Sequence, residues 1–364
     1  MRRLSNTIAR LTALRRNLNA SMDNVEGGPL EELTGFGANP GKLRALTYVP
    51  DSLAPGAPLV VVLHGCTQNA PGFDRGSGWS QLADRHGFAL LYPEQRRANN
   101  PNLCFNWYAP ADARRGRGEA ASIRQMVVKM IAAHDVDPAR IFVTGLSAGG
   151  AMTAVMLATY PELFAGGAII AGLPFATANS VSEALERMRG HGIPGERKLA
   201  SLAAGASKHN GPWPTLSVWH GTSDSIVDPV NAEAIVDQWR SVHGVSAAPA
   251  VVETVDGHRR RAWTDSRGRE VIEQFEVSGM GHGVPLDSHR PDAVGTVGPH
   301  MLEAGISSTD RIAQFWGLSE ASTARRERPS PPKIAPRQRA RAAPAKPAVT
   351  KVIEDALRAA GLMR

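Results

Sequence analysis

Short apolar runs alternate with segments of helical periodicity along the middle of the chain. Residues 59–63 are all apolar and end at His64-Gly65, as is typical of a buried parallel strand. Further strand-like runs cover 88–92, 141–144, 164–171, 216–219 and 271–277, and helices are predicted from residue 119 and over 148–159 and 231–242. The alternation predicts an α/β fold, a mostly parallel sheet with helices on both faces.

The two ends of the chain follow another pattern. Residues 1–40 are predicted to form a basic N-terminal arm, with an amphipathic helix over 3–19. Residues 321–347 contain six prolines and eight Lys or Arg, which predicts a disordered linker. Residues 348–364 are predicted to form a short C-terminal amphipathic helix. The interval 41–320 is left as the folded domain.

Charge is distributed unevenly over the 364 residues. The net charge is +7, but residues 1–20 hold five Arg and no acidic residue, and residues 321–364 carry +8. Residues 21–320 therefore carry −6, which argues against a domain that reads nucleic acid. The tails are left as candidates for binding an anionic or granule surface.

Targeting signals are weak in this sequence. No apolar run is long enough for a transmembrane helix. Arg10, Arg15 and Arg16 interrupt the stretch that would form the apolar core of a secretory signal, so a cytoplasmic location is expected. Two cysteines, Cys66 and Cys104, are too few for a disulfide framework or a metal cluster.

The strongest chemical signal is Gly145-Leu146-Ser147-Ala148-Gly149, a G-x-S-x-G motif. It lies between an apolar strand and a helix of small residues, the setting in which this motif places a nucleophilic serine on a tight turn. A Gly-rich turn with an incidental serine is the alternative. Ser147 is the predicted nucleophile.

A serine nucleophile needs a base, and the base needs an acid to orient it. Asp224 follows the strand 216–219, whereas its competitor Asp228 precedes Pro229 and suits a helix N-cap. His282 lies among glycines after the strand 271–277, with His289 and His300 as its downstream rivals. The order Ser147, Asp224, His282 is the order that this fold requires.

Stabilisation of an oxyanion needs two backbone N–H groups. Ala148, directly after the nucleophile, is predicted to give one of them. The other is expected from the loop after the early strand, from Cys66 or Thr67.

Several motifs in order resemble the polyhydroxybutyrate depolymerase family of esterases. These motifs cover about residues 40–317 and include 64–69, 80–88, Cys104-Phe105-Asn106-Trp107, 145–150 and Gly281-His282. The resemblance implies an α/β-hydrolase fold and the triad Ser147, Asp224 and His282. It also implies that 104–107 lies near the site, although many relatives have Trp where this chain has Phe105.

The resemblance implies a serine esterase that needs no metal or organic cofactor. Hydroxyalkanoate polyester or its oligomers are the expected substrates, with feruloyl or acetyl esters as the alternative and a hydrolase-like scaffold with binding tails as a different class. Gln68, Asn106 and Trp107 are candidates for the substrate pocket. Cys66 and Cys104 flank that pocket, either joined by a disulfide or as two free thiols; many family members are extracellular.

Overall fold

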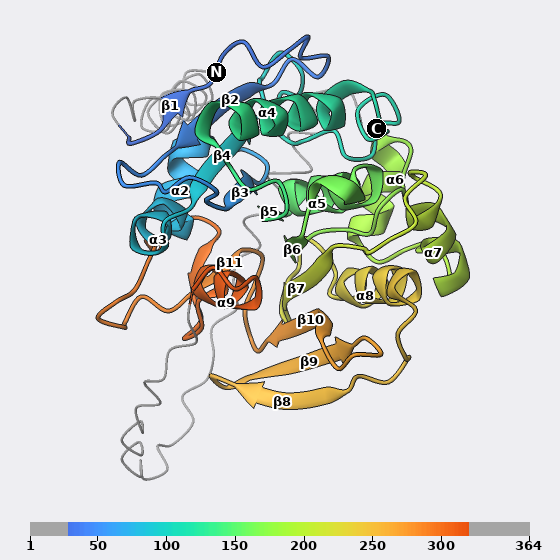
Figure 1. The fold of residues 1–364 in the computed structure, drawn as a ribbon. Coiled ribbons are helices and arrows are strands. Elements are labelled where there is room, and N and C mark those ends of the chain that lie inside the picture. The colour runs from blue at the N-terminus through green and yellow to red at the C-terminus, as the bar shows by residue number, and fades with distance from the viewer. Residues whose placement is uncertain (1–27, 320–364) are drawn as a thin grey trace, which may run out of the picture. The chain divides into compact units, whose positions relative to one another are not determined.

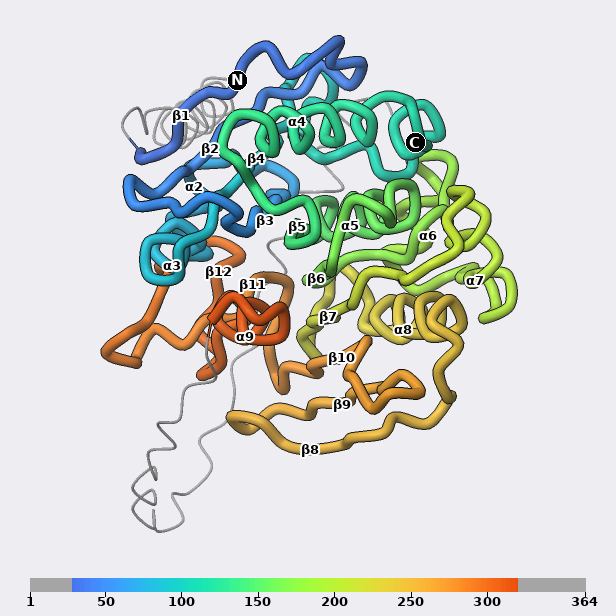
Figure 2. The backbone as a smooth tube through the Cα atoms, in the orientation of Figure 1, coloured from blue at the N-terminus to red at the C-terminus, as the bar shows by residue number. Residues whose placement is uncertain are grey.

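The structure is a computed structural model that describes residues 28–319, which belong to one compact unit (Figures 1 and 2). The predicted N-terminal helix, the linker 321–347 and the C-terminal helix 348–364 lie outside the described residues. Within residues 28–319, no helix is long and apolar enough to cross a membrane.

A ten-stranded sheet forms the centre of this unit. Its strand order is β1-β2-β4-β3-β5-β6-β7-β10-β9-β8. Six neighbouring strands, β4, β3, β5, β6, β7 and β10, run parallel to one another. The pairings of β1 and β2 at one end of the sheet, and of β9 and β8 at the other, are antiparallel. The strands are β1 Glu31–Glu32, β2 Arg44–Tyr48, β3 Leu59–Leu63, β4 Ala89–Glu94, β5 Ile141–Leu146, β6 Gly166–Ile170, β7 Thr215–Gly221, β8 Val251–Val255, β9 His258–Thr264 and β10 Glu270–Val277.

Helices cover both faces of the sheet. They are α2 Ala70–Ser77, α3 Trp79–His86, α4 Gly118–His134, α5 Ala148–Thr159, η1 Pro161–Leu163, α6 Val181–Met188, α7 Glu196–Ala204, α8 Val230–His243 and α9 Ser308–Phe315. Alternate residues of β3 show the two layers, because Val61 packs in the cluster with α4, α5 and α8 whereas Val60 packs in the cluster with α2, α3 and α9. The predicted fold class is confirmed.

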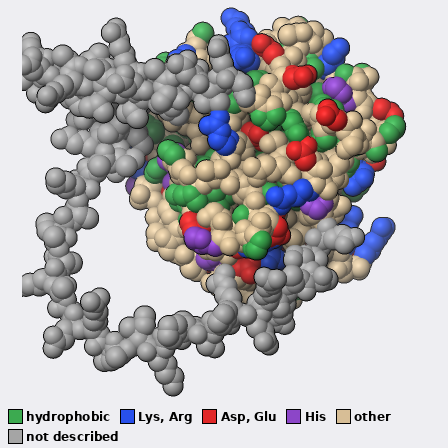
Figure 3. Space-filling view, turned by 90° about the vertical axis from the view of Figure 1, so that its left-hand side faces the viewer, with side chains coloured by type: hydrophobic (Ala, Val, Ile, Leu, Met, Phe, Trp, Pro, Cys, Tyr) green, Lys and Arg blue, Asp and Glu red, His purple; other side chains and the backbone are tan. Residues whose placement is uncertain are grey.

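A second, two-stranded parallel sheet lies after the long one in sequence. It pairs β11 (Val284–Leu286) with β12 (Met301–Glu303). On the face of the molecule drawn in Figure 3, basic and acidic side chains are interspersed.

One predicted boundary is shifted by the structure. The predicted N-terminal arm, residues 1–40, includes β1, which pairs with β2 at Glu31↔Thr47. The sheet therefore begins before residue 41. Charged β1 carries no apolar signal because both of its side chains are exposed.

Candidate active site

The three predicted triad residues follow three parallel strands. Ser147 comes directly after β5, Asp224 lies in the loop after β7, and His282 lies in the loop after β10. Since β5, β6, β7 and β10 are neighbours and run parallel, these loops lie at the same edge of the sheet. The carboxyl edge of an open α/β sheet is the usual position of an active site.

Ser147 occupies a strained turn between β5 and α5. Its φ of 57° and ψ of −116° lie in a region that side-chain-bearing residues rarely adopt. A Cβ on Gly145 would lie 2.5 Å from the Gly149 backbone, and one on Gly149 would lie 2.2 Å from the carbonyl oxygen of Leu63. Both glycines are therefore required by the close approach of the backbone, and the motif holds a strained serine at the helix N-terminus.

Asp224 and His282 form a buried pair. The Nδ1 atom of His282 lies 2.7 Å from Oδ2 of Asp224, and the two side chains are 7% and 0% exposed. The other oxygen, Oδ1, accepts the N–H groups of Ile226 (2.9 Å) and Val227 (3.0 Å). Burial raises the pKa of Asp224, but the hydrogen bonds from His220 and His282 outweigh it and hold this pKa below its usual range.

The loops that carry Asp224 and His282 are joined through their backbones. The N–H of Ser223 donates to the carbonyl oxygen of Met280 at 3.0 Å. A Cβ on Gly221 would lie 2.3 Å from that same oxygen, so a larger residue would force the two loops apart. These contacts fix the positions of Asp224 and His282 relative to each other.

Ser147 is separate from the pair in this structure. Its hydroxyl forms no hydrogen bond with any residue of the described ranges, His282 included, although catalytic hydrogen bonds are often long without substrate. Asp224 occupies Nδ1 of His282, so Nε2 is the ring atom available to a substrate or a nucleophile. Of the rivals, Asp228 accepts the N–H of Val230 at the start of α8, and His300 Nδ1 lies 3.1 Å from the carbonyl oxygen of His282.

The loop after β3 packs against the Ser147 turn. The N–H of Gly65 donates to Oε1 of Gln68 at 2.8 Å, which closes the loop on itself. The N–H of Thr67 donates to the carbonyl oxygen of Asn102 at 2.7 Å, whereas that of Cys66 donates to no group in residues 28–319. Of the two predicted donors, the structure therefore leaves Cys66 available. The N–H of Ala148, the first residue of α5, has no acceptor within the helix.

A disulfide ties this loop to the segment that follows Asn102. Cys66 and Cys104 are joined, with their Cα atoms 4.2 Å apart. Phe105 is fully buried, and its ring centroid lies 5.0 Å from that of His64. The ring of His64 accepts the N–H of Gln95 at Nε2 and donates to the carbonyl oxygen of Gly65 through Nδ1, and burial lowers its pKa.

Two of the predicted pocket residues, Asn106 and Trp107, make contacts that stabilise the segment after Cys104. The side chain of Asn106 donates to Oε1 of Glu119 at 2.8 Å and accepts from Asn100 at 3.0 Å. Trp107 is only 6% exposed and packs in the core. Sequence reasoning missed Glu119, because an acidic residue in the first turn of an amphipathic helix is common and gives no sign of burial.

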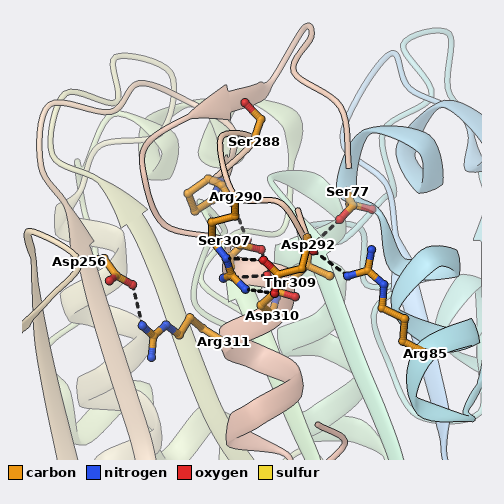
Figure 4. A network of polar contacts seen from close by, with 12 residues as sticks. Ser77, Arg85, Asp256, Ser288, Arg290, Asp292, Ser307, Thr309, Asp310 and Arg311 are labelled. Carbon is orange, nitrogen blue, oxygen red and sulfur yellow. Dashed lines mark hydrogen bonds and ion pairs between the residues drawn. The ribbon is translucent and has the colours of Figure 1, made fainter. Parts of the chain in front are cut away.

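A polar network fixes the segment that follows His282 against α2 and α3 (Figure 4). Arg290 pairs with Asp292 at 2.6 Å and with Asp310 of α9 at 3.4 Å. The hydroxyl of Thr309, buried in α9, donates to the carbonyl oxygen of Ser77 at 2.8 Å. These contacts hold α9 and the segment between β11 and β12, which follow the loop of the candidate base in sequence. Among residues 28–319 no group of three or more His, Cys, Asp or Glu is placed to hold a metal ion.

The chain is similar to known proteins over most of its length. The family model "Esterase PHB depolymerase" matches residues 43–261. Poly(3-hydroxyalkanoate) depolymerase C of Paucimonas lemoignei is 44% identical over 295 residues, which cover 79% of this chain and 70% of that protein. The chain belongs to the esterase PHB depolymerase family. Membership in this family makes it a carboxylic ester hydrolase of the serine type.

The chain is also similar to acetylxylan esterases. Acetylxylan esterase A of Aspergillus oryzae is 32% identical over 268 residues, which cover 71% of this chain and 85% of that protein. The solved acetyl xylan esterase from Aspergillus awamori superposes with a TM-score of 0.68 at 27% identity and covers 80% of this chain and 100% of its own. The α/β-hydrolase fold expected from the resemblance is confirmed.

The buried carboxyl of Glu119 predicts a pH dependence of stability. Burial raises its pKa from 4.5 to about 8, against the opposing hydrogen bonds from Gln95 and Asn106. The folded esterase therefore binds this proton more tightly than the unfolded chain does, so the contribution is fully present below about pH 4.5 and is lost as the pH rises to about 8. Such a change corresponds to a few kcal/mol in the free energy of unfolding.

The measurement is urea unfolding from pH 5 to 9 for the native protein and for Glu119→Gln. The native protein is expected to lose stability more steeply than the variant, because the variant has no proton to release. Parallel pH curves for the two proteins would contradict the prediction.

The disulfide predicts a second stability effect. Replacing both Cys66 and Cys104 with alanine removes a covalent link that closes 38 residues of chain. We expect a loss of about 2–4 kcal/mol in the free energy of unfolding, because the unfolded chain regains conformational entropy. Thermal unfolding with and without a reducing agent measures the effect. The reductant should lower the melting temperature of the native esterase and leave that of the double variant unchanged; insensitivity of the native protein contradicts it.

Proposed function

We propose that this esterase hydrolyses hydroxyalkanoate polyester or its oligomers through an acyl-enzyme formed on Ser147. The observation that carries the catalytic part is the buried Asp224–His282 pair, with Nδ1 to Oδ2 at 2.7 Å, at the sheet edge where Ser147 stands on a strained turn. The 44% identity to a poly(3-hydroxyalkanoate) depolymerase supports the substrate class.

The reaction has two steps in this proposal. His282 takes the hydroxyl proton of Ser147 at Nε2 while the serine oxygen attacks the ester carbonyl, and the protonated ring then gives this proton to the leaving alcohol. Water next attacks the acyl-enzyme with His282 again as base, which frees the acid and restores Ser147. Asp224 orients the ring and stabilises its charged form.

The N–H groups of Ala148 and Cys66 hold the negative charge that develops on the carbonyl oxygen. Cys66 is chosen over Thr67 because the Thr67 N–H is already bonded to Asn102. The disulfide joins the Cys66 loop to Cys104, and the hydrogen bonds of Glu119 hold the adjacent residue Asn106. In this proposal Gln68, Asn106 and Trp107 stabilise the conformation of the loop and of the segment joined to it. Gln68 accepts the N–H of Gly65, Asn106 bonds Glu119, and Trp107 packs in the core.

A feruloyl or acetyl esterase is the second candidate. The specific observation in its favour is the superposition with an acetyl xylan esterase over the whole of that chain. The two candidates differ in the acyl group that the site accepts and in the alcohol that it releases.

A substrate panel separates these candidates. It contains p-nitrophenyl esters of increasing chain length, 3-hydroxybutyrate oligomers, amorphous polyester, and feruloyl and acetyl sugar esters. The proposal expects the highest kcat/KM for hydroxybutyrate oligomers or the polyester. A preference for acetyl or feruloyl sugar esters supports the second candidate, and hydrolysis of none of these esters rejects both.

We also propose that the basic tails hold the esterase on an anionic or granule surface. The supporting observation is the charge, −6 over residues 21–320 against +8 over residues 321–364. A chain that ends at residue 320 is expected to lose binding to polyester granules and to anionic vesicles while it keeps its activity on p-nitrophenyl butyrate. Unchanged binding by the shortened chain contradicts this proposal.

A further inference from the structure

A second histidine contacts the carboxylate of Asp224. His220 lies near the end of β7 with its side chain 3% exposed. Its Nε2 atom lies 2.9 Å from the carbonyl oxygen of Val227 and 3.3 Å from Oδ2 of Asp224. That oxygen is the one that accepts His282, so two imidazole rings share one carboxylate oxygen.

The surroundings of His220 fix which nitrogen carries its proton. Both groups near Nε2 are acceptors, a backbone carbonyl and a carboxylate, so Nε2 must be the donor. Its Nδ1 is buried and has no hydrogen-bond partner among the described residues. A proton at Nδ1 would be buried without an acceptor, which disfavours it. The proton on Nε2 of His220 therefore lies between the Val227 carbonyl, its nearer acceptor, and the Asp224 carboxylate.

We propose that His220 is a positioning residue that sets the orientation and the basicity of Asp224 toward His282. This inference rests on the proposed catalytic role of the pair. The contact from His220 limits rotation of the carboxylate, because Ile226 and Val227 hold one oxygen while His282 bonds the other and His220 Nε2 lies 3.3 Å from it. A carboxylate that shares its charge with a second donor also attracts the proton of His282 less strongly.

Among residues 28–319, a further histidine that contacts the pair is His300, which directly precedes β12. Its ring centroid lies 5.8 Å from that of His282, and its Nδ1 atom contacts the His282 backbone rather than Asp224. His220 is therefore the group whose removal changes the hydrogen bonds of the carboxylate itself.

The test compares His220→Leu with His220→Gln in the full chain, with p-nitrophenyl butyrate as substrate. The leucine variant should lower kcat roughly ten-fold with KM nearly unchanged, the effect of losing one hydrogen bond to a charged group. The acid limb of its pH profile of kcat/KM should move up by roughly half a pH unit, because the carboxylate becomes more basic. The glutamine amide reaches about as far as Nε2, so His220→Gln should restore both values.

Two further variants keep the result interpretable. His220→Asn ends near the position of Nδ1 and is too short to reach Asp224, so it should reproduce the effects of leucine even where leucine does not fold. His243→Leu is the matched control, since His243 is a partly buried histidine bonded to the carbonyl oxygen of Pro214, before the start of β7. It should leave the pH profile unchanged.

The outcomes separate this inference from the proposed function. An inactive native protein, or a native protein whose Ser147 is not labelled by a fluorophosphonate, rejects the function. An active native protein whose leucine and asparagine variants lose activity without a shift of the acid limb assigns His220 a purely structural role and overturns the inference. Failure of glutamine to restore the limb overturns it as well.

Discussion

Ser147→Ala is expected to lower kcat for p-nitrophenyl butyrate by about 10⁴-fold or more, because the hydroxyl that forms the acyl-enzyme is lost. The fold should stay intact. The hydroxyl of Ser147 forms no hydrogen bond within residues 28–319, and alanine keeps the Cβ that the strained turn already accommodates. Initial rates and the melting temperature of the variant test both parts of this expectation.

Ser201→Ala is the matched control for this variant. Ser201 lies on α7, and its hydroxyl donates to the carbonyl oxygen of Lys198 in the same helix, away from the Ser147 turn. It should keep full activity and full labelling by a fluorophosphonate, whereas Ser147→Ala should lose both. Retention of activity in Ser147→Ala would remove the acyl-enzyme mechanism.

Parts of the buried centre of the sheet were predictable from sequence because they are almost entirely apolar. β3 and α5 coincide with the predicted ranges 59–63 and 148–159, and both are buried along their whole length. A short run of buried, mainly apolar residues between turn signals is the clearest local pattern for such segments.

The edge strands were not predictable in this way. The strand β9 reads His-Arg-Arg-Arg at its start, which no hydrophobic pattern marks as a strand. Its Arg260 pairs with Glu253 of β8 and with Glu273 of β10, so these charges are matched only when the three strands are already paired. Hydrophobic periodicity does not contain this hairpin, whose local signal is instead the Asp256-Gly257 turn, with φ of 50° and 86°.

The same distinction separates the site residues. Ser147 and His282 could be predicted because each lies in a glycine-flanked turn after a strand. His220 and Glu119 gain their roles from groups that other elements bring to them, the first from the His282 pair and the second from the segment at Asn106. Only the spacing of His220, four residues before Asp224, was a local sign of contact.

Asp224→Asn is expected to lower kcat by about 10³–10⁴-fold. The low pKa of Asp224 keeps the native carboxylate charged throughout the neutral range, so it stabilises the protonated ring of His282 at every working pH. In the native protein, donors approach both oxygens of the Asp224 carboxylate, whereas an asparagine side chain has only one acceptor oxygen. Its amide nitrogen must face either His282 and His220 or the N–H groups of Ile226 and Val227, and the ring loses its orientation in either case.

The depressed pKa also predicts the stability of this variant. A carboxyl whose pKa is lower in the folded than in the unfolded protein stabilises the fold above its unfolded value of about 3.8, and this contribution is lost as the pH falls. Asp224→Asn should therefore be less stable than the native esterase at pH 7, with the difference shrinking toward acid pH. Asp228→Asn is the comparison, because within residues 28–319 the carboxylate of Asp228 accepts the N–H of Val230 at the start of α8 and contacts no histidine. If Asp228→Asn costs more activity than Asp224→Asn, the acid of the triad is Asp228, and the short contact with His282 is structural.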